Sequence, residues 1–245
     1  MIDAVDIVGY GRLGQALHRL FESKGVKVRC IYSQSKTGER FASRDQWLSD
    51  EVMAPLVFLA IPDDQIALQL DRRSPTDSLF IQCSGNCERF ASNRFSTAVW
   101  YPLQSFSLDR SPDWDSIPVL IESESSELIS WSRGLGLNIQ SIDSQQRRSL
   151  HLAAVWANNF GQTVMGMAAE ICRDHELDPE LLKPLLDETL NKALALPGEQ
   201  AQTGPARRGD EQTLKDHLEL MQSDAAVQEL YRQLSQFIRQ RYGRV

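Results

Sequence analysis

The chain has 245 residues, of which 42% are hydrophobic and 24% charged, and its formal net charge is −7. This composition is typical of a soluble globular protein, and the acidic balance excludes sequence-independent binding to nucleic acid, which needs a basic surface. No apolar run approaches the ~18 residues of a membrane helix. The first residues predict a strand rather than a signal peptide.

The N-terminal segment combines an apolar strand with a glycine motif. Residues 5–8 lead directly into Gly9-Tyr10-Gly11-Arg12-Leu13-Gly14, and an amphipathic segment follows. In Gly-x-Gly-x-x-Gly, the first glycine permits the tight turn, the second lets a pyrophosphate approach the backbone, and the third lets the helix pack closely on the sheet. The free N–H groups and positive dipole end of the helix then face the phosphates. We therefore predict a dinucleotide site at these six residues; the alternative is a glycine-rich structural turn.

The end of the second strand, expected at residues 26–32, indicates which dinucleotide binds. An NAD site places an acid here, about twenty residues beyond the motif, on the ribose 2′-hydroxyl. This chain has Ser33-Gln34-Ser35-Lys36 instead. Hydroxyl, amide and ammonium groups suit a 2′-phosphate, which an acid would repel. We predict NADP(H) in preference to NAD(H); the alternative is that Lys36 and Arg40 belong to an ordinary solvated loop.

Strands and helices alternate through residue 144. Strands are expected at 56–61, 78–83, 98–102, 117–122 and 137–142, and helices around 45–48, at 65–70 and at 124–133. Asp63 or Asp64 would cap the helix at 65–70. The alternation predicts an α/β fold, a Rossmann-like domain at residues 1–144 with a doubly wound parallel sheet. The four cysteines lack zinc or redox spacing, which predicts reduced thiols in a cytoplasmic protein.

Residues 145–245 are predicted to form an all-helical domain. Residues 145–173 have the pattern of one long helix that is apolar nearly all round, so we expect it to be buried inside a bundle or between subunits. A helix is expected from Asp178-Pro179 to residue 194, kinked or restarted at Pro184. Residues 197–210 are expected to form a long loop, followed by helices at 211–221 and 224–242. Because a small bundle could hardly bury the long helix, we predict a homodimer through this domain.

Ligands of open α/β sheets lie beyond the carboxyl ends of the strands. The candidates at these ends include Ile61, Pro62, Ser84 and Gln104, although a plain turn is the alternative for residues 84–86. On the long helix, a rotation of about 100° per residue puts four polar side chains on one broad stripe; they are Arg148, His151, Asn158 and Asn159. They either satisfy one another or line a polar pocket opposite the dinucleotide site. No metal-ligand motif is evident.

Longer motifs carry a resemblance to known proteins; these are Tyr101–Ser107, Arg148–Phe160, Pro184–Thr189 and Gln202–Asp210. With the glycine motif, they resemble a Rossmann-like domain of the 6-phosphogluconate dehydrogenase-like superfamily, which includes pyrroline-5-carboxylate reductase, followed by a DUF2520 domain. The resemblance implies a bacterial NADP-dependent oxidoreductase that is often a dimer through its helical domain. It supplies no substrate. Many relatives have histidine where this chain has Tyr101, and the linking-helix lysine of the better-known dehydrogenases is absent, so their mechanism cannot be carried over.

The leading hypothesis is hydride transfer between NADP(H) and a small carbonyl or imine compound bound between the domains. His151 would donate a proton, because imidazole exchanges protons near neutral pH. Gln104, Asn158 and Asn159 would orient the substrate oxygen or nitrogen, and Arg148 would neutralise a substrate carboxylate or form a structural salt bridge. The alternative is a non-catalytic NADP(H)-binding regulatory or interaction protein in which the helical domain serves only dimerisation.

Overall fold

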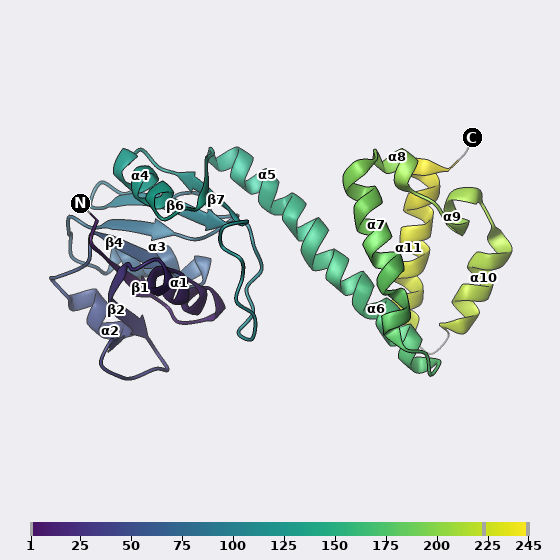
Figure 1. Cartoon of the computed structure of the whole chain (residues 1–245), viewed down its shortest axis with the longest axis horizontal. Coiled ribbons are helices and arrows are strands. Elements are labelled where there is room, and N and C mark those ends of the chain that lie inside the picture. Colours follow the sequence, from purple (N-terminus) through teal and green to yellow (C-terminus); the bar gives the residue numbers. More distant parts are fainter. Residues whose placement is uncertain (1, 222–223, 244–245) are drawn as a thin grey trace. The chain divides into compact units, whose positions relative to one another are not determined.

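The computed structural model describes residues 2–221 and 224–243, and it divides into two compact units (Figure 1). Unit 1 is Met1–Asn158 and unit 2 is Asn159–Val245. The division lies inside the helical stretch that follows the last strand. The change from strands to helices that we predict at residues 144 and 145 coincides with the start of that stretch.

Unit 1 contains an eight-stranded sheet in the order β3-β2-β1-β4-β5-β6-β7-β8. Its strands are β1 (Ala4–Val8), β2 (Lys27–Ser33), β3 (Phe41–Ser43), β4 (Leu56–Leu59), β5 (Leu79–Gln82), β6 (Ser96–Pro102), β7 (Pro118–Glu122) and β8 (Asn138–Ser141). The predicted Rossmann-like fold class is confirmed. The expectation of a wholly parallel sheet is wrong at one edge, because β7 pairs with β6 in the antiparallel direction and β8 runs parallel to β7.

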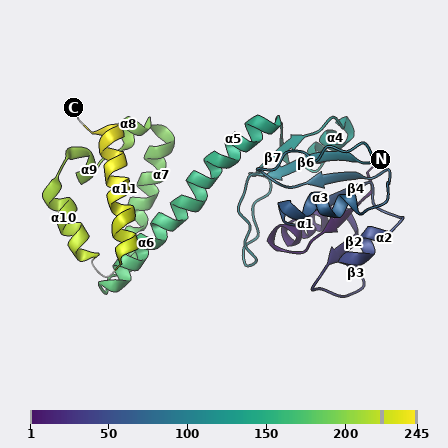
Figure 2. The ribbon, with the colours of Figure 1, turned by 180° about the vertical axis from the view of Figure 1, so that it is seen from behind.

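Helices cover both faces of the sheet. On one face, α1 (Arg12–Ser23) and α4 (Ser126–Gly134) pack against apolar side chains of β1, β4, β6 and β7. On the other face, α2 (Arg44–Ser49) and α3 (Asp63–Asp71) pack on alternate residues of the same sheet. The α1 side is in front in Figure 1 and the α3 side in Figure 2. The sheet is therefore buried on both sides, which explains its continuous apolar strands.

A buried ion pair joins β1 to β2. Asp6 is fully buried, and its carboxylate accepts hydrogen bonds from the Arg29 guanidinium at 2.6 and 2.9 Å and from the N–H groups of Cys30 and Ala54 at 3.0 and 2.9 Å. The strand register shifts between Val5 and Asp6, so that Arg29 has no partner residue on β1. This bulge brings the Arg29 side chain to the Asp6 carboxylate, so the buried charge is compensated.

The predicted long helix has three parts: α5 (Ser144–Ala154), a π-helical turn η1 (Val155–Phe160) and α6 (Gly161–Asp174). Asp143 caps α5 in a capping box with Gln146. Of the two expected kinds of burial, burial inside the chain's own bundle is wrong, because Leu152, Trp156 and Val164 are 60%, 63% and 48% exposed, and burial between subunits stays a prediction. An apolar pattern predicts that a surface is covered but does not specify by what.

Unit 2 is helical throughout its described part beyond α6. A short 3-10 helix η2 (Pro179–Leu182) precedes α7 (Lys183–Ala195), α8 (Gly198–Ala201), α9 (Pro205–Arg208), α10 (Glu211–Leu220) and α11 (Ala225–Tyr242). The expected cap at Asp178 and the helix restart near Pro184 are confirmed. The long loop expected at 197–210 is wrong, because α8 and α9 lie within it. Among the described residues, no helix combines the length and apolar character that crossing a bilayer requires.

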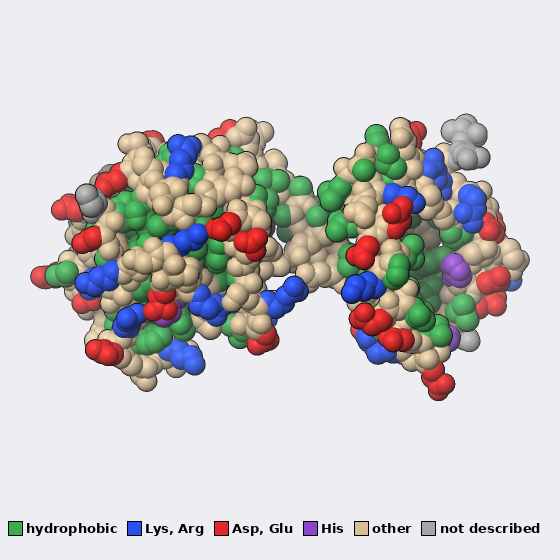
Figure 3. Space-filling model, in the orientation of Figure 1, with side chains coloured by type: hydrophobic (Ala, Val, Ile, Leu, Met, Phe, Trp, Pro, Cys, Tyr) green, Lys and Arg blue, Asp and Glu red, His purple; other side chains and the backbone are tan. Residues whose placement is uncertain are grey.

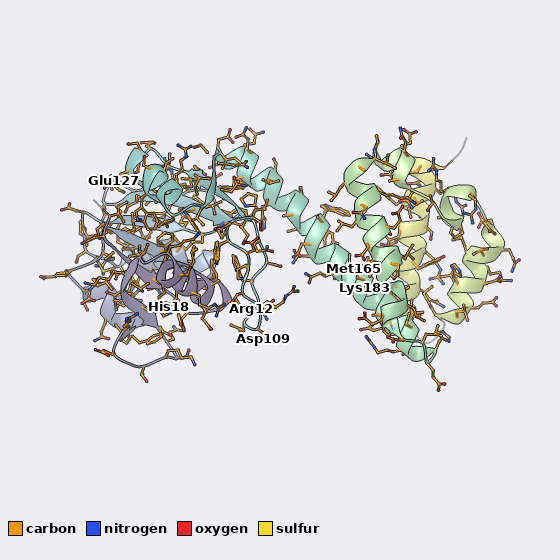
Figure 4. The ribbon with its side chains drawn as sticks, viewed as in Figure 1. Arg12, His18, Asp109, Glu127, Met165 and Lys183 are labelled. Atoms are coloured by element: carbon orange, nitrogen blue, oxygen red, sulfur yellow. The ribbon has the colours of Figure 1, made fainter. Side chains whose placement is uncertain are left out.

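Unit 2 has almost no buried core of its own. Among its described residues, only Ala206 and Leu214 are buried hydrophobics. Large apolar side chains stay exposed along its helices; the most exposed are Leu181, Leu185, Leu190, Leu194 and Leu220, at 60% to 80%. Figure 3 shows apolar side chains at the surface of this unit, and Met165, labelled in Figure 4, is 50% exposed on α6. A helical unit with so little internal burial is expected to need a covering partner.

Candidate active site

The glycine motif forms an open cradle at the carboxyl end of β1. Gly9 has φ +98°, and a Cβ there would overlap the Ala60 carbonyl oxygen. At Gly14 a Cβ would overlap the Gly9 carbonyl oxygen, so these two glycines allow close packing. By contrast, a Cβ on Gly11 would meet nothing within 4 Å. Gly11 therefore borders free space, whereas its two neighbours in the motif are required by packing.

The N-terminus of α1 opens onto this cradle. Gly11 is its N-cap residue, no side chain caps it, and within this described turn there is no acidic residue. Arg12 is exposed at the first helical position (Figure 4). An uncapped helix start with its positive dipole end and a nearby arginine is suited to an anion.

The end of β2 forms a polar turn next to the cradle. Ser33 is buried, and its hydroxyl oxygen accepts the N–H groups of Ser35 and Lys36 at 3.3 and 3.2 Å. Gln34, Ser35 and Lys36 are exposed. Arg40 pairs with Glu22 at 2.8 Å. The turn thus uses the Ser33 oxygen internally and presents the other three side chains outward.

A hollow of about 330 Å³ lies beside this turn. It is lined by Ser33, Gln34, Ser43, Asp45, Gln69 and Arg72. Arg72 follows α3 at its C-terminal end and is exposed. Sequence reasoning missed it, because α3 and β2 are distant in the chain. Arg72 is therefore a second cation near the end of β2, in addition to Lys36 on the turn. The hollow is also lined by the Asp45 carboxylate.

At the ends of β4 and β5 the side chains bond to one another. The Ser84 hydroxyl donates to Asp63 at 2.8 Å and accepts the N–H groups of Asn86 and Cys87 at 3.2 and 3.0 Å. The expectation that Asp63 or Asp64 caps α3 is wrong, because Pro62 is the N-cap residue and makes no side-chain cap bond. Ile61 and Pro62 lie in the link between β4 and α3. Ser84 is thus engaged in shaping its own turn.

Arg147 holds that turn from the side of α5. Its side chain is fully buried and donates to the carbonyl oxygens of Ser84 at 2.9 Å and Cys87 at 2.8 Å. It also pairs with Glu122 at 3.0 Å. The guanidinium therefore ties the turn after β5 to β7 and α5, and the fork geometry of arginine suits this role.

Tyr101 and His151 meet over Gly85. The Tyr101 hydroxyl lies 3.1 Å from His151 Nδ1, and the two rings contact edge to face with centroids 5.8 Å apart. A Cβ on Gly85 would come within 2.7 Å of Tyr101 Cζ and would also overlap the imidazole. Burial raises the pKa of Tyr101, although the charge of Arg147 opposes the shift. The carboxyl ends of β5 and β6 thus present a neutral phenol bonded to an imidazole.

The remaining predicted residues lie after β6, on α5 and in the π-helical turn. Gln104 is exposed, and its side-chain oxygen accepts the N–H of Ser105 at 2.8 Å. Arg148 forms an exposed ion pair with Glu88 at 3.3 Å. Asn158 and Asn159 both lie in the π-helical turn, where successive residues rotate by less than in an α-helix. The stripe computed at about 100° per residue therefore does not describe them.

Two contacts of the site escaped sequence reasoning. Arg147 is four residues before His151, a spacing that puts both on one face of α5, so the i, i+4 rule could have pointed to it. Tyr101 is fifty residues before His151, and no local pattern links them. Within the described residues, no three His, Cys, Asp or Glu side chains gather as a metal site would need.

Comparisons with known proteins match both parts of the chain. A family model described as a domain of unknown function, DUF2520, matches residues 117–238. Proteins of curated function give no match. Among solved structures, a Bacteroides fragilis protein classed provisionally as an NADP oxidoreductase is 30% identical, and the alignment covers 98% of this chain and 100% of that chain with a TM-score of 0.83.

Two more distant structures share the fold. A reductive aminase from Aspergillus terreus, solved with NADPH and ethyl levulinate, is 16% identical over 99% of this chain and 96% of its own, with a TM-score of 0.73. The pyrroline carboxylate reductase of Plasmodium falciparum, solved with NADP, is 13% identical over 95% of this chain and 98% of its own, with a TM-score of 0.60.

Proposed function

Because this chain belongs to the family of Rossmann-fold proteins that carry a DUF2520 domain, we propose that it is an NADP(H)-dependent oxidoreductase that reduces a small carbonyl or imine compound. The observation that carries this proposal is the free space at Gly11, directly before the uncapped N-terminus of α1. The six residues from Gly9 to Gly14 would hold the pyrophosphate there. The bound cofactor would supply the hydride, and the protein would supply position and protons.

The ribose 2′-phosphate would lie at the end of β2. Lys36, Gln34 and Ser35 are exposed on the turn, and Arg72 lines the neighbouring hollow. Two cations with an amide and a hydroxyl provide charge-assisted hydrogen bonds to a phosphate. NADH lacks this phosphate, so it would leave those cations unused. We therefore expect NADPH to bind more tightly than NADH.

The reacting end of the cofactor would reach the ends of β5 and β6, beyond Ile61 and Pro62. In open α/β sheets the ligand lies across the carboxyl ends of the strands, starting where the strand order reverses, here between β1 and β4. The Ser84 turn is held by Asp63 and Arg147, so its main chain is fixed. A carbonyl or imine suits this end, because the phenol and imidazole there donate hydrogen bonds to oxygen or nitrogen.

The helical unit would be covered by a second copy of the chain. Its described residues bury few apolar side chains, while Leu185, Leu190 and Leu194 of α7 are 60% to 80% exposed. A C2 dimer would remove such a surface from water without another protein. Light scattering should give twice the 27.7 kDa of one chain. Leu190→Glu should produce monomers, whereas Leu68→Glu on α3, with nearly equal exposure of 59% against 60%, should not. Dimers with both variants would refute this interface.

Cofactor binding and turnover test the enzymatic proposal separately. Fluorescence titration should give tighter binding of NADPH than of NADH, and Gly11→Asp should abolish both by placing a carboxylate in the pyrophosphate position. Oxidation of NADPH would then be followed with a panel of small ketones and aldehydes, each with and without an amine. NADPH binding without turnover of any compound would favour the non-catalytic alternative. Equal affinity for NADH would refute the role of Lys36 and Arg72.

A further inference from the structure

We propose that Tyr101 is the proton donor of the reduction and that His151 is the positioning residue that orients the Tyr101 hydroxyl and returns its proton. This inference rests on the proposed function. The geometry points to it because the Tyr101 hydroxyl and His151 Nδ1 lie 3.1 Å apart at the carboxyl end of β6. Gly85, at the end of the adjacent strand β5, leaves the space that both rings occupy.

The protons and electrons of the step balance. As hydride reaches the substrate carbon, the C=O or C=N π electrons move to the oxygen or nitrogen, which takes the proton of the Tyr101 hydroxyl. The phenolate oxygen then takes the Nδ1 proton of His151 while Nε2 of the same ring takes a proton from water, so no imidazole anion forms. Proton exchange with water then restores the Nδ1–H form of the ring. The overall reaction consumes the substrate, NADPH and one proton, and it yields the reduced product and NADP⁺.

The surroundings of Tyr101 suit a donor. A phenol is protonated at neutral pH and has a proton to give; burial raises the pKa of Tyr101, and the charge of Arg147 opposes that rise. The Arg147 guanidinium is the charged group that acts on it, and this charge would stabilise the transient phenolate. The same arginine is fixed by the turn carbonyls and by Glu122, so it stabilises the phenolate without being free to move.

A second tyrosine–histidine pair provides a matched control. In unit 2 the Tyr231 hydroxyl lies 2.7 Å from His217 Nδ1, and the ring centroids are again 5.8 Å apart. The interplanar angles are 70° for Tyr101–His151 and 76° for Tyr231–His217. The control pair lies on α10 and α11 of unit 2, whereas Tyr101 and His151 belong to unit 1. Tyr231→Phe therefore removes an equivalent hydroxyl without touching the proposed donor.

The first test needs no substrate. The protein has four histidines, so their ring nitrogens can be resolved by ¹⁵N NMR in the protein without cofactor. Tyr101→Phe should shift the Nδ1 resonance of His151 alone, and Tyr231→Phe should shift that of His217 alone. An unchanged His151 resonance in Tyr101→Phe would refute the bond on which the inference depends.

The second test measures turnover of the best compound from the NADPH-oxidation panel. Tyr101→Phe should lower kcat by about 10²–10⁴-fold, the range of general acid catalysis, while Tyr231→Phe keeps wild-type kcat. The Kd of NADPH should change by no more than about twofold in Tyr101→Phe, because the variant removes a transition-state interaction only. His151→Asn, which keeps an amide near the Nδ1 position, should retain more kcat than His151→Ala.

The outcomes separate the two proposals. Wild-type protein that fails to bind NADPH, or binds it and reduces no compound, overturns the proposed function. Wild-type turnover with an unimpaired Tyr101→Phe variant leaves the proposed function standing and refutes the proton donor. Equal losses in Tyr101→Phe and Tyr231→Phe also refute it, because both would then report a general structural effect.

Discussion

Replacing Arg147 by methionine should cost about 3–5 kcal/mol of folding free energy, because it breaks the buried pair with Glu122 and leaves buried carbonyl oxygens without a donor, while Arg89 stays at 3.9 Å from Glu122. The side chain is fully buried, Glu122 is 17% exposed, and two carbonyl oxygens of the Ser84–Cys87 turn also lose their donor. For a domain of about 150–250 residues, each kcal/mol lowers Tm by roughly 2–4 °C, so the expected loss is about 6–20 °C.

The neighbouring arginine provides the control for this prediction. Arg148 pairs with Glu88 at 3.3 Å, with the two side chains 50% and 80% exposed. Exposed pairs contribute about 0–1 kcal/mol, so Arg148→Met should shift Tm by only a few degrees. Urea denaturation followed by tryptophan fluorescence measures both changes, and Arg147→Met combined with Glu122→Gln should recover part of the loss. Equal destabilisation by the two methionine variants would refute the conclusion that the buried contacts of Arg147 with Glu122 and the Ser84–Cys87 turn stabilise the fold.

Two further predictions concern the glycine motif and alkaline pH. Gly9→Ala should destabilise the fold, because φ is +98° and the added Cβ would overlap Ala60, whereas Gly11→Ala should keep wild-type Tm and weaken NADPH binding. Thermal melts and NADPH titrations of both variants check this, and a stable Gly9→Ala would contradict it. Burial raises the pKa of Tyr32 and of Tyr101 in the native state. In the unfolded chain the same phenols ionise near pH ~10, so at higher pH they are neutral when folded and charged when unfolded. The contribution of these phenols to the free energy of unfolding should be fully present below that pH and should be lost as the pH rises toward the native pKa. Tyr101→Phe should lose less Tm than wild type between about pH 8 and about pH 10.5, and an equal loss would contradict the burial effect.

The sequence predicted most of unit 1 because its strands are continuous apolar runs between turn residues. Such a run predicts a strand at residues 117–122 but does not encode its direction. The antiparallel pairing with β6 therefore could not be predicted. The three-residue strand β3 escaped because it is too short to show a period. In unit 2, the segments of α8 and α9 are predicted as a loop because they contain proline and glycine, which favour turns as well as helix starts.

The candidate site was predictable where its chemistry is local. The motif from Gly9 to Gly14 and the turn after β2 are contiguous, so their spacing carries the information. The bonds of Tyr101 to His151 and of Ser84 to Asp63 join residues 50 and 21 positions apart, and only the folded chain brings them together. The π-helical turn also had no sequence signal that we could identify, so the angular placement of Asn158 and Asn159 could not be derived.

The Asp6–Arg29 pair constrains how this sequence can drift through evolution. Losing Arg29 alone would leave the fully buried Asp6 carboxylate unpaired at about 3–5 kcal/mol, a large share of the roughly 5–15 kcal/mol that typically keeps a protein folded. Exchanging both for apolar residues of similar volume is often neutral. A sequence with the pair and a sequence with two apolar residues are therefore both stable, whereas the single substitution that leaves Asp6 without Arg29 is not. Descendants should keep the aspartate, the arginine and the bulge between them, or lose all three together.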